Sequence, residues 1–178
     1  TSCILDLDST VLPLYGWTIQ GARVGYNPKK PRRPSYHPLV CFEGHTQDTV
    51  HGMLRPGDTH PITAARRFSR ACLAKLPRYA NRKKVTVRLR ADAGFYDRKF
   101  VGFLDEAGWG YVIVAKMTAP MRAEAEQRRF RTFRKLGRWQ VAQTMRQPSR
   151  WKWPHRFVLV RRPKPQKAEE AAQLTLWE

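Results

Sequence analysis

The chain has 178 residues, of which 34 are Lys or Arg and 14 are Asp or Glu, so its formal net charge is +20. A protein this basic attracts polyanions, and nucleic acid is the commonest of them. With 42% hydrophobic and 11% aromatic residues, the chain has the apolar content for a core, which excludes full disorder. The length predicts one domain, or one domain with a small insertion, and the apolar runs are too short for a membrane span.

The first half of the chain predicts a strand, a basic loop and a hairpin. Residues 2–8 are apolar and end in two acids, which indicates a buried strand. Residues 13–36 are rich in Gly and Pro and predict a loop, made basic by residues 29–33. Residues 37–44 and 49–54 predict two strands joined by a turn.

The next segments predict two helices that alternate with two strands. Residues 62–76 carry apolar residues at helical spacing, and residues 84–91 alternate as a strand does. Asp97 is expected to cap a helix that ends at Gly108, and residues 109–115 predict another short strand. This order of elements predicts a mixed α/β layer with a helix-covered sheet.

The character of the chain changes after Lys116. Residues 121–167 contain 15 Lys and Arg residues but only 2 Glu. Within them, residues 121–135 are expected to be helical, and residues 137–145 and 151–162 to form two strands. A linker at residues 163–165 and a short final helical stretch follow, and we expect the chain to be cut there.

Asp8 and Asp92 form the strongest candidate pair for chemistry. Each lies at the end of a predicted hydrophobic strand. If the strands are parallel neighbours, both carboxylates reach one edge of the sheet, where open α/β sheets place their sites. Two carboxylates there suit Mg²⁺ or Mn²⁺, which can promote phosphoryl transfer. The alternative is that Asp8 begins a turn and that Asp92 is a loop acid before Gly94.

Other candidate ligands are weaker. Asp6 would share a face with Asp8 but lies deeper in the strand, so we interpret it as the partner of an Arg. Asp97 and Asp105 are interpreted as a helix cap and a helix-surface residue. The histidines of the hairpin region lack the spacing of a zinc site. Cys3, Cys41 and Cys72 lie too far apart for a disulfide set, which fits a reducing cytosol, and no signal peptide is visible.

Basic and aromatic residues form the second candidate site, a surface for DNA. Lys and Arg neutralise phosphates, while exposed aromatic rings can stack on unpaired bases. The aromatic residues could instead form the small core of this segment. The candidate DNA-binding residues are Lys29, Lys30, Arg32, Arg33, Arg128, Arg129, Arg131, Arg134, Lys135, Trp151 and Trp153.

Five motifs in order resemble the DDE transposases of bacterial insertion sequences, in the branch with a β-rich insertion in the catalytic core. They are Asp-Leu-Asp-Ser-Thr (6–10), Gly-Tyr-Asn-Pro-Lys-Lys (25–30), Ser-Tyr-His-Pro-Leu (35–39), Leu-Arg-Pro-Gly (54–57) and Arg-Ala-Asp-Ala-Gly-Phe-Tyr (90–96). The resemblance covers nearly the whole chain.

The resemblance implies an RNase H-like core, a mixed sheet with flanking helices, and a metal site of two Asp and one Glu. Asp8 matches the first acid and Asp92 the second, with Mg²⁺ or Mn²⁺ as cofactor. The third acid is expected beyond residue 178, with Glu169 and Glu170 as weaker candidates. Accordingly, residues 1–117 would form the first part of the core, 118–166 the basic β-rich insertion, and 167–178 the start of the return to the core.

The leading hypothesis is therefore part of a transposase that cuts and joins DNA at the ends of a mobile element. We expect DNA as partner, no membrane, a homodimer of the full-length protein, and a bacterial cytoplasmic, nucleoid-associated location. A nuclease of related fold, a non-catalytic nucleic-acid-binding protein and an inactive remnant of a transposase gene are the alternatives.

Overall fold

A five-stranded mixed sheet forms the centre of the first part of the chain. In this computed structural model, residues 2–16, 18–27, 30–76, 85–133 and 137–162 are described. The strand order is β6 (Thr49–Met53), β5 (Leu39–Glu43), β1 (Ser2–Ser9), β7 (Thr86–Ala91) and β8 (Gly110–Ile113). Strands β1, β7 and β8 run parallel, while β5 is antiparallel to both of its neighbours. This confirms the RNase H-like mixed sheet and the predicted hairpin.

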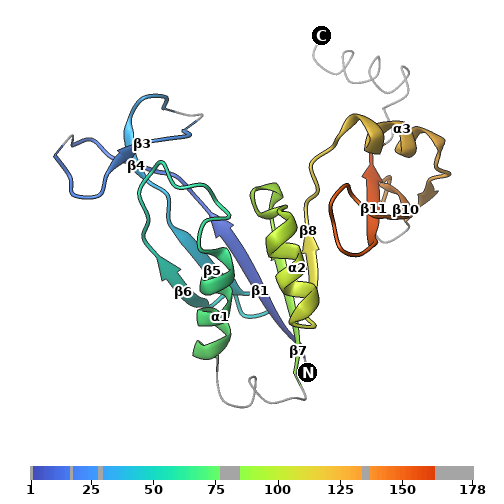
Figure 1. Cartoon of the computed structure of the whole chain (residues 1–178), viewed down its shortest axis with the longest axis horizontal. Coiled ribbons are helices and arrows are strands. Elements are labelled where there is room, and N and C mark those ends of the chain that lie inside the picture. The colour runs from blue at the N-terminus through green and yellow to red at the C-terminus, as the bar shows by residue number, and fades with distance from the viewer. Residues whose placement is uncertain (1, 17, 28–29, 77–84, 134–136, 163–178) are drawn as a thin grey trace, which may run out of the picture. The chain divides into compact units, whose positions relative to one another are not determined.

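Two helices cover one face of this sheet, as Figure 1 shows for α1 (Ala65–Lys75) and α2 (Arg98–Glu106). The alternation of β1 turns Cys3, Leu5 and Leu7 toward them, and Leu89 of β7 lies on the same side. The helices add aromatic and aliphatic side chains to one buried cluster, including Phe68, Phe100 and Leu104. As predicted, Asp97 caps α2 by accepting hydrogen bonds from the backbone N–H groups of Lys99 and Phe100.

The alternate residues of β1 and β7 point to the opposite face. There the Arg90 guanidinium forms an ion pair with Asp6 that joins the two strands, and Arg90 Nε lies 2.5 Å from Asp6 Oδ1. The interpretation of Asp6 as the partner of an Arg is confirmed. Its side chain is half-buried, with 25% of its surface exposed.

The Gly- and Pro-rich segment after β1 is more regular than its composition predicted. It contains a small antiparallel sheet of β2 (Leu12–Pro13), β4 (Pro34–Tyr36) and β3 (Arg23–Val24), with β4 in the middle. The expectation of loop alone over residues 13–36 was wrong, because two-residue strands are too short to show an alternating pattern.

The chain divides after Lys116 into two compact units. The second unit contains α3 (Ala119–Gln127), β9 (Arg131–Thr132), β10 (Gln140–Arg146) and β11 (His155–Arg161). Its three strands form an antiparallel sheet with β10 in the middle. Met121, Ala142, Phe157 and Leu159 are its buried apolar side chains within the described ranges.

The helix predicted over residues 121–135 ends earlier, at Gln127. The backbone becomes extended at Arg128. Residues 131–132 then pair with β10, so their peptide groups form hydrogen bonds within the sheet instead of within the helix. That the second unit is an insertion in the core remains a prediction, and the predicted return segment 167–178 lies outside the described residues. Over the part of the chain that is described, no helix is both long and apolar enough to cross a membrane.

Candidate metal site and nucleic-acid surface

The pairing of β1 with β7 brings Asp8 and Asp92 to one edge of the sheet. The two strands are parallel, and their last paired residues are Leu7 and Ala91. Asp8 and Asp92 are the next residues of the two strands, so they stand at the same register position, although β1 continues to Ser9 through its pairing with β5 on the other side. Since neighbouring strands lie about 4.8 Å apart, the two backbones are close enough for both carboxylates to reach one point.

Each of these carboxylates is held on one side and open on the other. Asp8 Oδ1 accepts a hydrogen bond of 2.7 Å from the backbone N–H of Ser9. Asp92 Oδ1 accepts one of 2.9 Å from Gly94 and so begins a single turn of 3₁₀ helix, η1 (Ala93–Phe95). Both residues are exposed, and neither Oδ2 atom has a hydrogen bond to any residue that the structure describes.

This arrangement fits a divalent cation with oxygen ligands. Two carboxylate oxygens at one open edge are the donor type that Mg²⁺ and Mn²⁺ prefer, and water or a phosphate can supply the remaining ligands. Among the described residues, no cluster of three or more His, Cys, Asp or Glu side chains could hold a metal. Glu169 and Glu170, the weaker candidates for a third acid, lie outside those residues.

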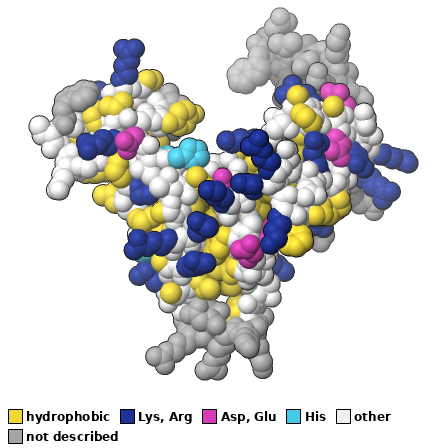
Figure 2. Space-filling view, in the orientation of Figure 1, with side chains coloured by type: hydrophobic (Ala, Val, Ile, Leu, Met, Phe, Trp, Pro, Cys, Tyr) yellow, Lys and Arg dark blue, Asp and Glu magenta, His cyan; other side chains and the backbone are white. Residues whose placement is uncertain are grey.

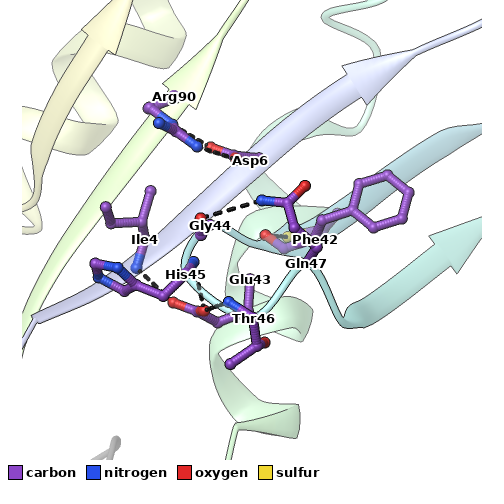
Figure 3. A network of polar contacts seen from close by, with 10 residues as sticks. Ile4, Asp6, Phe42, Glu43, Gly44, His45, Thr46, Gln47 and Arg90 are labelled. Carbon is purple, nitrogen blue, oxygen red and sulfur yellow. Dashed lines mark hydrogen bonds and ion pairs between the residues drawn. The ribbon is translucent and has the colours of Figure 1, made fainter.

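Two neighbouring acids are already engaged by the protein, as Figure 3 shows. Asp6 is paired with Arg90, and this interaction raises the pKa of Arg90. Glu43 caps the turn after β5 by accepting hydrogen bonds from the backbone N–H groups of Ile4, His45 and Thr46. Partial burial opposes ionisation of Glu43, but these donors outweigh it and lower the pKa of its carboxyl. Asp8 and Asp92 therefore differ from both in keeping an open oxygen.

A family model described as transposase DDE domain group 1 matches residues 1–172. The chain belongs to this family. A comparison with curated proteins gives no match.

Solved transposase structures resemble this DDE domain at low identity. A piggyBac transposase synaptic complex with hairpin DNA matches with a TM-score of 0.47 and 15% identity, over 88% of this chain and 32% of that one. The catalytic domain of Mos1 mariner transposase matches with a TM-score of 0.42 and 17% identity, over 75% of this chain and 65% of that domain. The DDE domain thus spans about a third of the piggyBac chain, and its family assignment rests on the family model.

The basic loop of the DDE domain surrounds an exposed tyrosine. Lys30 Nζ lies 4.8 Å from the centre of the Tyr15 ring, and the Arg33 guanidinium carbon lies at the same distance. The Lys30 ammonium also donates a hydrogen bond to the Tyr15 hydroxyl, and this contact lowers the pKa of Tyr15. Arg32 is exposed, and Lys29 lies outside the described residues. The ring thus holds two of the predicted DNA-binding cations side by side.

The predicted DNA-binding arginines of the second unit differ in whether they already form contacts within the protein. Arg129 and Arg131 are exposed and have no ion pair within the described ranges. Arg128, by contrast, donates hydrogen bonds to Glu124 (2.7 Å) and Thr144 (2.9 Å), so it also stabilises the unit. Arg134 and Lys135 lie outside the described residues.

The two tryptophans also differ. Trp153 is 48% exposed, and Lys152 Nζ lies 5.0 Å from its ring centre. Trp151 is half-buried, and its ring meets the His155 ring edge-on at 5.1 Å. Trp153 is therefore the better placed of the two for stacking on a base.

Sequence reasoning missed a further basic surface on α1. Arg66, Arg67 and Arg70 lie on its exposed side, and Figure 2 shows Lys and Arg side chains gathered over α1 and α2. Arg70 stacks on the Phe103 ring, at 4.9 Å from its centre, whereas Arg66 and Arg67 have no ion pair with a described residue. The available signal was an amphipathic helix whose polar face holds no acid.

Proposed function

We propose that this chain carries the DNA-cutting and DNA-joining centre of a transposase, with Asp8 and Asp92 as catalytic metal ligands. The observation that supports this most is the parallel register, in which Leu7 pairs with Ala91 and an acid follows each of them. The proposal also rests on the family, since a DDE domain implies transposition chemistry.

In this proposal the two Asp side chains act through their open oxygens. The backbone amides of Ser9 and Gly94 fix one oxygen of each carboxylate, so the other is aimed outward from the strand ends. A bound Mg²⁺ or Mn²⁺ would supply charge stabilisation and activation of a water or a 3′-hydroxyl for attack on the phosphodiester. The carboxylates, already oriented by these amides, would hold the cation with little rearrangement on binding.

The basic surfaces would hold the DNA that this edge processes. Lys30, Arg32 and Arg33 belong to the same compact unit as the acids, and the α1 arginines do as well, while Lys29 would act beside Lys30. Arg128, Arg129, Arg131, Arg134 and Lys135 would add contacts from the second unit, with Trp151 and Trp153 on exposed bases. We further propose that the full-length protein works as a homodimer on element ends and target DNA, in the bacterial cytoplasm with the nucleoid.

A direct test combines metal binding with DNA chemistry. Mn²⁺ binding to the 178-residue chain is measured by titration, and cleavage and strand joining are assayed with the full-length gene product on the DNA that flanks its reading frame. We expect binding and both reactions to be lost in Asp8→Asn and in Asp92→Asn. Cleavage without joining would indicate a nuclease of related fold. A chain that binds no Mn²⁺, and whose DNA affinity is unchanged in Asp8→Asn and in Asp92→Asn, would be a non-catalytic binding protein.

A further inference from the structure

Arg55 is a buried cation, and its hydrogen-bond partners among the described residues all carry no charge. It lies in the loop between β6 and α1, and only 6% of its surface is exposed. Its Nε donates to the carbonyl of His37 (2.8 Å), and its Nη2 donates to the Ser9 hydroxyl (2.9 Å). Its Nη1 faces three carbonyls, those of Thr63, Pro61 and His60, at 2.8, 3.2 and 3.3 Å.

One of these hydrogen bonds leads to Asp8. Ser9 directly follows this acid, and its backbone N–H donates to the Asp8 carboxylate. Because Arg55 fixes the Ser9 side chain, it restricts the rotation of the same residue whose amide orients Asp8. The guanidinium therefore acts on the first carboxylate through a single residue.

The other hydrogen bonds lead to Asp92. Arg55 holds the turn of residues 60–63, and Pro61 of this turn lies against Gly94. A Cβ atom at Gly94 would come within 3.0 Å of Pro61 Cβ and 3.1 Å of Asp92 Oδ1. Since the Gly94 N–H donates to Asp92, the turn that Arg55 holds is in contact with the turn that orients the second acid.

We propose that Arg55 is a positioning residue that fixes the two strand ends carrying Asp8 and Asp92 relative to each other. The inference rests on the proposed function, because it assigns a purpose to the spacing of these acids. A guanidinium suits this role because its five donors lie in one rigid plane and can hold several oxygens at once. The ammonium of Lys has three donors at one point and cannot reach both Ser9 and the turn.

The test uses substitutions that remove these contacts while keeping the charge or the shape. Arg55→Lys keeps the charge but loses the fork, and Ser9→Ala removes one acceptor, whereas Ser9→Thr retains the hydroxyl. Arg122→Lys, an exposed residue of α3, controls for the exchange of Arg for Lys. Cys72→Ala, at a fully buried position of α1, controls for loss of stability.

Two readouts are measured on each variant: the Kd for Mn²⁺, and amide hydrogen exchange at Ser9 and Gly94 in the metal-free protein. Changing residues that support metal ligands typically weakens metal binding by about 10–100-fold, and we expect that range for Arg55→Lys and the low end for Ser9→Ala. Ser9→Thr should stay close to wild type. In Arg55→Lys, exchange at both amides should be faster, while exchange in α2 and in both controls should not change.

The outcomes separate this inference from the proposed function. Wild-type Mn²⁺ affinity in both Arg55→Lys and Ser9→Ala would overturn the positioning role. If the wild type itself binds no Mn²⁺, the proposed function fails, and exchange at Ser9 and Gly94 alone then decides whether Arg55 orders the strand ends. If Arg55→Lys does not fold, Ser9→Ala against Ser9→Thr decides, since equal affinities would overturn the inference.

Discussion

Asp8 and Asp92 in the first unit and Glu124 in the second use their carboxylates in opposite ways. In the first unit, Asp8 and Asp92 each accept one backbone hydrogen bond and keep an open oxygen. In the second unit, both oxygens of Glu124 are taken: Oε1 accepts from Arg128 and Thr144, and Oε2 accepts from Arg146 at 2.9 Å. A carboxylate enclosed by donors stabilises its own fold, whereas one left open at a strand end is suited to an outside ligand.

The cores of the two units also differ in size. The sheet and helices of the first unit bury many large apolar side chains, five of which are Leu5, Leu89, Phe68, Phe95 and Phe100. Among described residues, the second unit buries only Met121, Phe157 and Leu159 as large apolar side chains. Since each contributes about 1.5–3 kcal/mol, this core is small, and the contacts of Glu124 add to the stability that it supplies.

The largest expected effect is the loss of Mn²⁺ binding when either open acid is changed. Asp92→Asn removes a charge and an oxygen ligand from the strand end, and Asp8→Asn does the same on the neighbouring strand. We expect each to weaken Mn²⁺ binding by more than about a hundredfold, beyond the loss typical of residues that only support ligands. Isothermal titration of each variant with Mn²⁺ measures this.

Two enclosed acids provide the matched controls. Asp6→Asn and Glu124→Gln also remove one negative charge each, but from carboxylates that Arg side chains already engage. Both should bind Mn²⁺ nearly as the wild type does. Equal losses at Asp6 and Asp8 would mean that charge alone, and not the open oxygen, determines binding.

An intermediate effect on DNA affinity is expected when basic residues are changed. It shows which of the two units contributes more to DNA binding. The affinity should fall with salt, with a slope that loses about 0.9 for each phosphate contact removed. Arg129→Glu with Arg131→Glu should flatten the slope through the second unit, and Arg66→Glu with Arg67→Glu through α1. Fluorescence anisotropy with a labelled duplex at several salt concentrations measures both. An unchanged slope in both pairs would favour the loop cations Lys30, Arg32 and Arg33.

The smallest expected effect concerns the stability of the second unit. Hydrogen bonds from Thr144 and Arg128, with Arg146, lower the pKa of Glu124 from 4.5 to about 2. The stabilising contribution is therefore complete above pH 4.5 and is lost as the pH falls toward 2. Glu124→Gln should lower the Tm by a few degrees at pH 7 and reduce the dependence of Tm on acid pH, followed by circular dichroism. The same acid dependence in both proteins would contradict this role.

The regular parts of the fold could be predicted because their patterns are local. The alternation in residues 84–91 predicted β7, and the helical spacing of residues 62–76 predicted α1. The end of α3 could not be predicted in this way. The chain leaves the helix there to pair with β10, and this pairing joins residues that are not neighbours in the sequence.

The candidate site was predictable where it depends on strand ends. Two apolar runs that each end in Asp indicated the acids. The two acids come together only if the strands pair in parallel, and β1 and β7 do so. The role of Arg55 could not be predicted, because four of its five acceptors are backbone carbonyls, which every residue has. The motif of residues 54–57 marked the position without giving the contacts.

The loop after Arg55 also packs closely against the small sheet beside the basic residues 30–33, and two glycines lie at this contact. A Cβ atom at Gly25 would lie 2.0 Å from the Gly57 carbonyl oxygen, and one at Gly57 would lie 2.2 Å from Ser35 Oγ. Neither glycine position leaves room for a side chain between the two segments. This close packing thus fixes the distance between the basic residues 30–33 and the two acids Asp8 and Asp92. A methyl group added at Gly25 or Gly57 would change this distance. A basic loop moved into another protein would need both glycines to keep the same distance.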